Sequence, residues 1–346
     1  MAAPLVAARL PPVRSRRRRW IGLAVAGALL LVVVTLSLSL GTRATSLDSV
    51  IGALLDPLPG NNDHLVIREL RVPRTIIGLV VGAALAIAGT LMQGITRNPL
   101  ADPGLLGVNA GASLFVVLAI SVLGITSPSG YIWFAFAGAA VATAVVYGVG
   151  TLGREGATPV KLALAGTALT AGLTSIITLL LITDIDTLSS YRFWSVGSLV
   201  NRDLDTVAVL LPFLLLGVVL AFGIGSTLNV LSLGDDLARG PGQRVGFSRA
   251  IAAVSIVLLC GAATALAGPI VFVGLVIPHL VRPLTGPDYR WILAYSAVLG
   301  PVLLLVADVV GRLLSYPGEI EAGLVVALIG APVLIVIVRR SKVAGL

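Results

Sequence analysis

The chain has 346 residues, of which 57% are apolar and only 12% are charged, and its mean hydropathy is +1.03. This composition excludes a pair of soluble domains, because soluble domains carry about 25% charged residues. The long apolar runs predict an all-α, polytopic membrane protein, so the net charge of +8 is not a nucleic-acid signature.

The chain opens with a basic tail, residues 1–19, which precedes an apolar run from Trp20 to Leu40. A secretory signal peptide is the alternative interpretation. Its apolar core would be about 7–15 residues long, however, and no convincing cleavage site follows this longer run. We therefore expect an uncleaved first span with the basic tail in the cytoplasm.

The stretch from Arg71 to Leu114 predicts a helical hairpin in the membrane. Its first run, Thr75–Ile95, has about 20 residues, enough to span ~30 Å of hydrocarbon. Asn98 precedes a proline and is pushed out of the α region, which breaks this run. Asp102 can cap the second helix, near residues 104–124, with Pro103 in its first turn.

Small residues recur at intervals of four in the first run of the hairpin. Gly78, Gly82 and Ala86 fall on one helix face, where they let another helix approach closely.

The remaining apolar runs bring the number of spans to about ten. Residues 268–279 form a short run interrupted by Pro269 and Pro278, which predicts a strained, short eighth span. Residues 184–204 contain Tyr191 and Trp194 and fit an interfacial segment. The other runs lie near residues 131–152, 159–183, 205–224, 248–268, 290–314 and 320–338.

The distribution of lysine and arginine supports ten spans with both termini in the cytoplasm. This arrangement places 17 of the 24 basic residues on the inner side and 7 on the outer side. The bias follows the positive-inside rule, whereas nine spans would send the basic C-terminus outside.

No catalytic or metal-binding motif is found. The chain lacks a G-x-x-x-x-G-K-[ST] phosphate loop, an H-E-x-x-H motif and a Cys/His cluster, and its single Cys260 is interpreted as a packing residue. We therefore expect no enzymatic activity, no metal and no cofactor. Only Asp308 lies well within a long run, and Arg312 follows four residues later, so a structural ion pair near the outer end is expected. A proton relay, and with it an ion-coupled secondary transporter, is the weaker alternative.

The sequence TRNPLADPGLLGVNAGAS, residues 96–113, resembles the iron–siderophore and vitamin B12 permeases, the membrane subunits of type II ABC importers. It is most similar to ferric-enterobactin-type permeases. The resemblance continues at residues 192–199, Leu233–Gly246, Gly268–Arg282 and Ala307–Arg340. It implies the type II ABC importer permease fold, with one transmembrane domain at residues 20–340 and a short cytoplasmic tail at 341–346.

The longest inner loop, about residues 225–248, is too rich in glycine and charge to cross a bilayer. A solvated connector is one interpretation. The loop also resembles the coupling loop of the family, two short helices that sit in a groove of the ATPase subunit. Relatives more often carry an apolar residue at Pro241, and we expect the second short helix to begin there. The residues implied in coupling are Leu233, Gly234, Asp236, Ala238, Arg239 and Gly246.

The resemblance implies that Arg71, Arg74 and Arg312 receive acidic residues of a substrate-binding protein. A guanidinium fork suits carboxylates better than a lysine point charge does. Because Pro73 holds the backbone rigid, we expect the side chains of Arg71 and Arg74 to point outward. Anchoring to lipid head groups is the alternative.

The resemblance also places Asn98 and Leu100 near a cytoplasmic gate. Thr167, Thr170 and Thr174 lie on or near one face of the run from Lys161 to Thr183, and they are candidates for the pathway wall. Small hydroxyl side chains there could equally be packing residues.

The implied function is ATP-driven import of a ferric siderophore across the cytoplasmic membrane. The implied partners are the lipid bilayer, a second permease, identical or paralogous, two cytoplasmic ATPase subunits and an extracytoplasmic binding protein, with no nucleic acid. Vitamin B12 and haem remain alternative cargoes.

Overall fold

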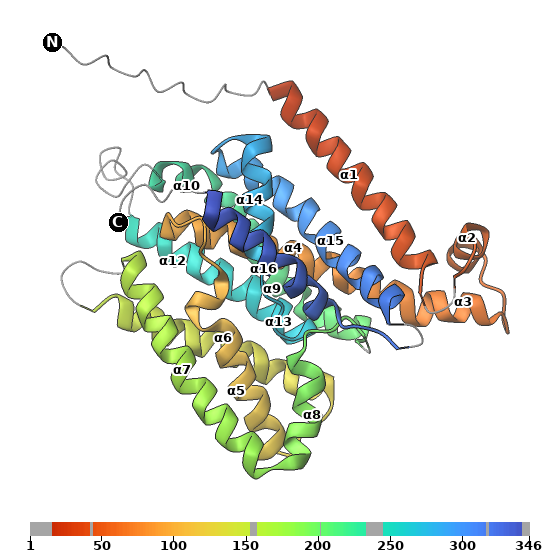
Figure 1. Cartoon of the computed structure of the whole chain (residues 1–346), viewed down its shortest axis with the longest axis horizontal. Helices are drawn as coiled ribbons and strands as arrows, with labels where there is room; N and C mark the ends of the chain where they lie inside the picture. The colour runs from red at the N-terminus through yellow and green to blue at the C-terminus, as the bar shows by residue number, and fades with distance from the viewer. Residues whose placement is uncertain are drawn as a thin grey trace.

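A computed structural model describes residues 16–41, 44–152, 158–200, 202–232, 245–315 and 318–340, which form helices without strands. One group of helices surrounds α4, and a second group, α5 to α8, forms a lobe beside it (Figure 1). The first group contains α4 (Val72–Thr96), α9 (Leu204–Gly223), α12 (Val245–Ile256), α13 (Ala262–Ala267), α14 (Val273–Thr285), α15 (Tyr289–Leu314) and α16 (Ala322–Arg340). The second contains α5 (Val108–Ser121), α6 (Pro128–Gly150), α7 (Pro159–Thr183) and α8 (Ile185–Ser195).

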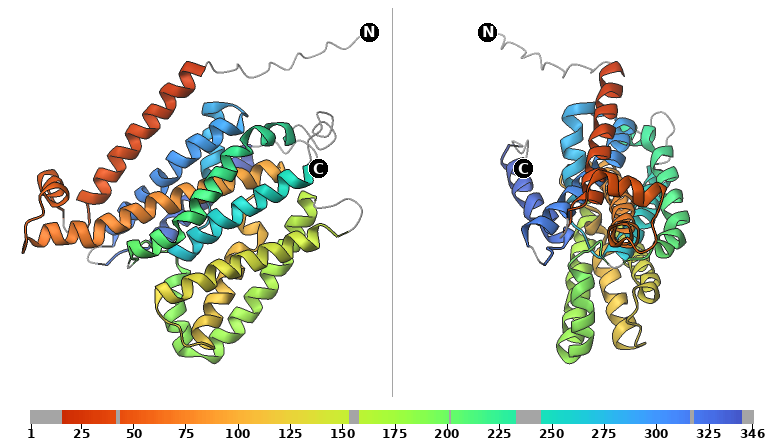
Figure 2. Two further views of the ribbon diagram at one scale, coloured as in Figure 1. Left: turned by 180° about the vertical axis from the view of Figure 1, so that it is seen from behind. Right: turned by 90° about the vertical axis from the view of Figure 1, so that its right-hand side faces the viewer.

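Four helices lie at the periphery of these groups. The first, α1 (Arg16–Ser39), packs mainly along α15 and leads to the short helices α2 (Leu47–Leu55) and α3 (Asn62–Val66) (Figure 2). The fourth, α10 (Gly225–Leu231), follows α9 and contacts both α4 and α15.

The membrane architecture expected from the sequence is confirmed. Within the described ranges, 7 helices are long and apolar enough to cross a membrane, and three shorter apolar helices accompany them at Val108–Ser121, Val273–Thr285 and Ala322–Val336. Together they correspond to the expected spans. The helix α8 has 11 residues, too few to cross, and its Trp194 is buried in the protein rather than presented to an interface.

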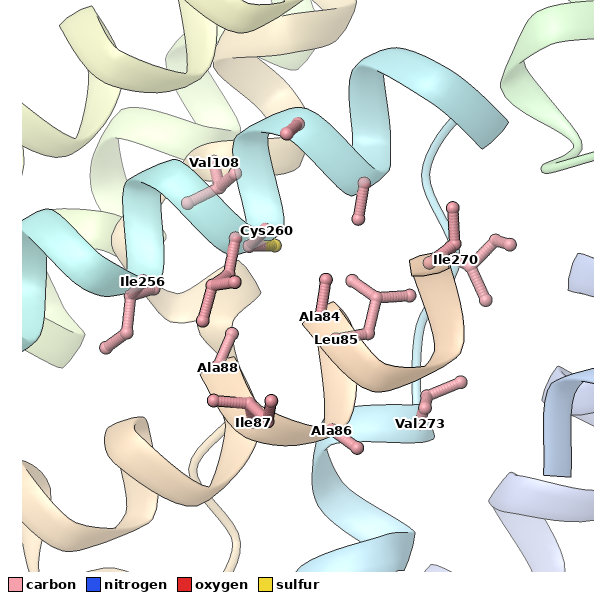
Figure 3. Packing of buried hydrophobic residues seen from close by; sticks show 14 of the residues in the cluster. Ala84, Leu85, Ala86, Ile87, Ala88, Val108, Ile256, Cys260, Ile270 and Val273 are labelled. Atoms are coloured by element: carbon pink, nitrogen blue, oxygen red, sulfur yellow. The ribbon is translucent and has the colours of Figure 1, made fainter. Parts of the chain in front are cut away.

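The helix α4 is the centre of the fold and is buried along most of its length. Its most extensive contact is with α15, where Gly82 lies against the backbone of Gly300 and Pro301. A Cβ at Gly89 would overlap the backbone of Gly274 in α14. Figure 3 shows the apolar side chains of this helix facing those of α12 and the following turn. Small residues thus allow close helix packing, and the expectation for Gly82 is confirmed.

The second span begins earlier than the sequence predicts. A π-helical turn at Ile67–Arg71 joins α3 to α4, so one helix runs from Asn62 to Thr96. The backbone N–H of Val72 donates to the carbonyl of Ile67, which is the wide spacing of a π turn. Pro73 follows directly. It has no backbone N–H to donate, and the wide turn tolerates the missing hydrogen bond.

The eighth span is short, as expected. Because Gly274 lies against Gly89 in the middle of α4, α14 begins about half-way through the bundle. Its 13 residues measure about 20 Å, less than a full crossing. The connection from α13 places Gly268 (φ +77°) and Phe272 (φ +70°) in the left-handed region, where a phenylalanine is strained.

The charged residues gather at two opposite ends of the bundle. At one end, Arg71 donates to the carbonyl of Ser39 and Arg312 donates to that of Ser37, and we name it the Arg71 end. At the other, Arg19 of α1 lies 3.7 Å from Asp288 before α15, and we name it the Asp288 end. Arg71 and Arg312, which the sequence assigns to one side of the membrane, are therefore found at the opposite end of α1 from Arg19, which it assigns to the other side.

Candidate functional site

A cavity of about 350 Å³ opens at the Arg71 end of the bundle. It lies between the π turn before α4, the segment before α9, and the end of α15, three elements that are far apart in the sequence. Four arginines and three carboxylates contribute to its walls. They are Arg71, Arg74, Arg202, Arg312, Glu69, Asp203 and Glu319.

Asp308 binds two of these arginines and is fully buried. Its carboxylate accepts hydrogen bonds from Arg74 Nε at 2.9 Å and from Arg74 Nη2 at 2.7 Å. It also accepts one from Arg312 Nη2 at 2.6 Å, which confirms the ion pair expected along α15. A buried carboxylate between two guanidinium groups is stabilised only while these hydrogen bonds are kept.

The other hydrogen bonds of these arginines hold the end of α1. Arg71 Nη1 donates to the carbonyls of Leu38 and Ser39, both at 2.7 Å. Arg312 Nη1 donates to the carbonyls of Ser37 at 3.0 Å and Leu40 at 2.8 Å. The last carbonyls of a helix lack hydrogen-bond donors within the helix, and here two arginines supply those donors.

The expectation that Arg71 and Arg74 point outward is therefore wrong. Arg71 is 6% exposed, and the Arg74 side chain is 10% exposed. The physical reason is that the end of α1 and Asp308 both require donors, and the guanidinium groups satisfy them inside the protein. The structure nevertheless brings Arg71, Arg74 and Arg312 together in the wall of one cavity. This grouping is what a common role in docking would require.

Two further charged side chains, Glu319 and Arg202, line this cavity, and the sequence did not single them out. Glu319, before α16, accepts a hydrogen bond from Arg74 Nη1 at 2.6 Å, and its side chain is 30% exposed. Arg202 Nη1 donates to the hydroxyl of Tyr131 at 3.1 Å. Among the described residues, the Nε–H groups of Arg202 and Arg312 find no acceptor. With four arginines in its walls, the cavity is suited to bind a carboxylate.

Asn98 and Leu100 lie in the turn after α4. Arg97 ends the helix in the left-handed conformation (φ +52°), and Asn98 Oδ1 then accepts the backbone N–H of Leu100 at 2.9 Å. Asn98 also lines a cavity of about 300 Å³ that α7 closes through Val160, Ala163 and Leu164. The structure therefore places the residues assigned to the gate beside the helix that carries the pathway candidates.

The hydroxyl residues of α7 lie on a poorly covered helix. Thr167 and Thr174 are exposed and Thr170 is partly exposed. The Thr167 hydroxyl donates to the carbonyl of Ala163 in the same helix, at 2.8 Å. The start of the helix is held tightly, where a Cβ at Gly166 would overlap the carbonyl of Leu105. The Thr167 hydroxyl is therefore satisfied within its own helix.

Most of the predicted coupling loop, including Leu233, Gly234, Asp236, Ala238 and Arg239, lies outside the described residues. Gly246 is exposed in the first turn of α12. The start of the loop is described and is anchored by Asn229 of α10. Its Nδ2 donates to Asp288 Oδ1 at 2.8 Å, and its Oδ1 accepts the backbone N–H of Tyr289 at 2.7 Å.

Asp288 is therefore the residue that connects the loop to α15. Burial raises the pKa of Asp288, but hydrogen bonds from Asn229 and Arg290 outweigh it and hold this pKa below its usual value. The carboxylate is ionised near neutral pH. An Asn and an Asp that are 59 positions apart carry no local motif, so sequence reasoning missed this contact.

Comparisons with known proteins agree with this architecture. The FecCD transport family matches residues 29–340. The siderophore transport system permease protein YfiZ of Bacillus subtilis is 43% identical over 93% of this chain and 97% of its own. The ferric enterobactin transport system permease protein FepD of Escherichia coli is 46% identical over the same shares. A solved structure of an inward-facing metal-chelate type ABC transporter has a TM-score of 0.80 at 29% identity, covering 94% of this chain and 100% of that chain.

The fold and these comparisons define a multi-pass, all-helical membrane permease of the ABC transporter class. The chain belongs to the FecCD transport family. The resemblance first drawn from residues 96–113 is thereby confirmed.

Proposed function

We propose that this permease imports a ferric siderophore across the cytoplasmic membrane, with energy from ATP hydrolysis by a partner subunit. The observation that carries the proposal is the similarity to the siderophore and ferric enterobactin permeases over 93% of the chain. The Asp288 end, which includes the basic start of α1, then faces the cytoplasm, and the Arg71 end faces outward.

The cavity at the Arg71 end is the docking site for an extracytoplasmic binding protein. Support comes from the four arginines in its walls. An acidic side chain of the partner can enter such a cavity and accept charge-assisted hydrogen bonds. Arg202 is the better first contact, because Arg71 and Arg312 already hold α1.

The poorly covered helix α7 faces a second permease, with the substrate pathway between the two copies. Only 11% of the residues in the most apolar stretch of α7 are buried inside the chain, although several large apolar side chains lie along this helix. A single copy therefore leaves its hydroxyl residues, Thr167, Thr170 and Thr174, accessible to a pathway. Asn98 and Leu100 lie at the cytoplasmic end of this pathway and act as its gate.

The loop that continues from α10 couples transport to the ATPase. Its support is the resemblance of residues 233–246 to the coupling loop of the family, together with the anchoring of Asn229 on Asp288 at the start of α15. A force applied to the loop by an ATPase would be passed through this contact to α15.

The test is transport by the reconstituted complex. The permease, co-expressed with its ATPase, is placed in liposomes together with its binding protein, and uptake of ⁵⁵Fe-labelled ferric enterobactin and ferric hydroxamate siderophores is measured. We expect uptake that requires ATP and the binding protein. Uptake of cyanocobalamin or haem instead would show that the proposed substrate is wrong. Uptake driven by an ion gradient without an ATPase would overturn the assignment to ABC importers.

A further inference from the structure

Arg74 is bound by two carboxylates that differ in kind. Asp308 is fully buried and accepts hydrogen bonds from Arg74 Nε and Nη2. Glu319 accepts from the remaining nitrogen, Nη1, and its side chain is 30% exposed. Asp308 therefore fixes the guanidinium in place, whereas Glu319 occupies the side of the fork that faces the cavity.

The backbone that carries Glu319 is itself held in place. The N–H of the next residue, Ile320, donates to the carbonyl of Gly311 at 3.1 Å, and Gly323 donates to the carbonyl of Gly197 at 2.9 Å. Withdrawal of the Glu319 carboxylate from Arg74 consequently needs only side-chain rotation. The buried Asp308 has no such freedom, because it lies within α15 and is bound by two arginines.

The charges around the cavity are already balanced by the chain itself. Four arginines, Arg71, Arg74, Arg202 and Arg312, are matched in number by the carboxylates of Glu69, Asp203, Glu319 and the buried Asp308. An acidic side chain of a docking protein can therefore form both hydrogen bonds to an arginine only when an internal carboxylate moves away from that arginine.

We propose that Glu319 is an internal placeholder for the carboxylate of a docking protein. In the free permease it completes the fork of Arg74, and on docking it rotates away while a partner Asp or Glu takes its position. This inference rests on the proposed docking function of the cavity. The exchange of one carboxylate for another keeps Arg74 paired throughout, and it lowers the affinity for proteins that offer no well-placed acid.

The first experiment measures access to Arg74 without any partner. The permease in lipid nanodiscs is treated with phenylglyoxal, which modifies guanidinium groups, and the modification of Arg74 is followed by peptide mass spectrometry. Glu319→Gln should accelerate modification of Arg74 by about two- to fivefold, the scale of one partly exposed ion pair. Glu69→Gln removes the same charge from the same cavity and is the matched control. Equal rates in all three proteins would overturn the proposal.

The second experiment measures docking of the purified binding protein of the same transport system by biolayer interferometry. Glu319→Gln should tighten binding by about two- to fivefold, and the gain over Glu69→Gln should persist at 0.5 M salt, where fields are screened within a few ångströms. Glu319→Asp keeps the charge but withdraws the carboxylate by about one methylene, so it should also tighten binding. Unchanged binding by both Glu319 variants would overturn the placeholder alone. No binding to the unmodified permease would overturn the docking function as well.

Discussion

Asp308 and Arg74 are 234 positions apart, yet the carboxylate of the first accepts hydrogen bonds from two nitrogens of the second. This contact joins the start of α4 to the end of α15, the two helices that share the most extensive interface of the bundle. Arg312 approaches the same carboxylate from within α15. The cluster therefore fixes the relative positions of the two helices at the Arg71 end.

Replacement of Asp308 by asparagine should destabilise the protein strongly. It leaves Arg312 buried without a counter-charge and Arg74 paired with Glu319 alone, a loss that costs about 3–5 kcal/mol in comparable sites. Thermal unfolding of the detergent-solubilised protein, followed by tryptophan fluorescence, measures the effect. Asp203→Asn removes an exposed carboxylate from the same cavity and should change stability by less than about 0.5 kcal/mol. An unfolding temperature of Asp308→Asn equal to that of the unmodified protein would contradict this account.

The close contact of Gly89 with Gly274 predicts a large effect of a single methyl group. Gly89→Ala should force α4 and α14 apart and destabilise the protein by about 1–3 kcal/mol, because a Cβ there would overlap the Gly274 backbone. Gly148→Ala is the control, since a Cβ at this position of α6 meets no atom within 4 Å. The same thermal unfolding assay should separate the two variants, and equal stabilities would argue against the close packing.

The orientation of the bundle is tested by reporter fusions. Green fluorescent protein joined after Leu346 should fluoresce, because we expect both termini in the cytoplasm. Alkaline phosphatase inserted between Leu58 and Asn61, near the Arg71 end, should be active, since this enzyme requires the outer compartment. A dark C-terminal fusion together with an inactive phosphatase insertion would indicate the opposite orientation.

Arg239→Glu tests the coupling role proposed for the loop. The variant should insert into the membrane normally but co-purify with less ATPase, because it reverses a charge in the expected contact with that subunit. Arg18→Glu is a control at the same end, because it reverses an exposed charge of α1 outside the contact between the loop and Asp288. Normal assembly and normal ATP hydrolysis with Arg239→Glu would make the loop a simple connector.

Arg202→Gln tests docking without disturbing the buried cluster. Charge reversal at Arg71 or Arg74 would disrupt the contacts with α1 and Asp308, so it cannot separate docking from folding. Arg202 is only partly buried, and its loss should slow association of the binding protein by about two- to fivefold at low salt. The difference should shrink as salt is raised, because the Debye length falls below ~8 Å. An association rate independent of Arg202 at low salt would count against the cavity as the docking site.

The sequence predicted the spans and one half of the charged cluster. Apolar run lengths are local, so they located the helices, and the i,i+4 spacing of Asp308 and Arg312 predicted their pair. The third member, Arg74, could not be assigned to Asp308, because nothing local relates residues 234 positions apart. The burial of Arg71 was missed for a similar reason, since it depends on where α1 ends and how its carbonyls approach α4.

The attachment of α1 has a consequence for the biogenesis of the protein. This helix is synthesised early and is little buried along its length, yet its final carbonyls accept hydrogen bonds from Arg312, 275 positions after Ser37. Until α15 has entered the membrane, these carbonyls lack one of their two arginines. Translocation of α15 therefore completes the attachment of the first helix, and a ribosome stalled before residue 312 would leave the end of α1 held by Arg71 alone.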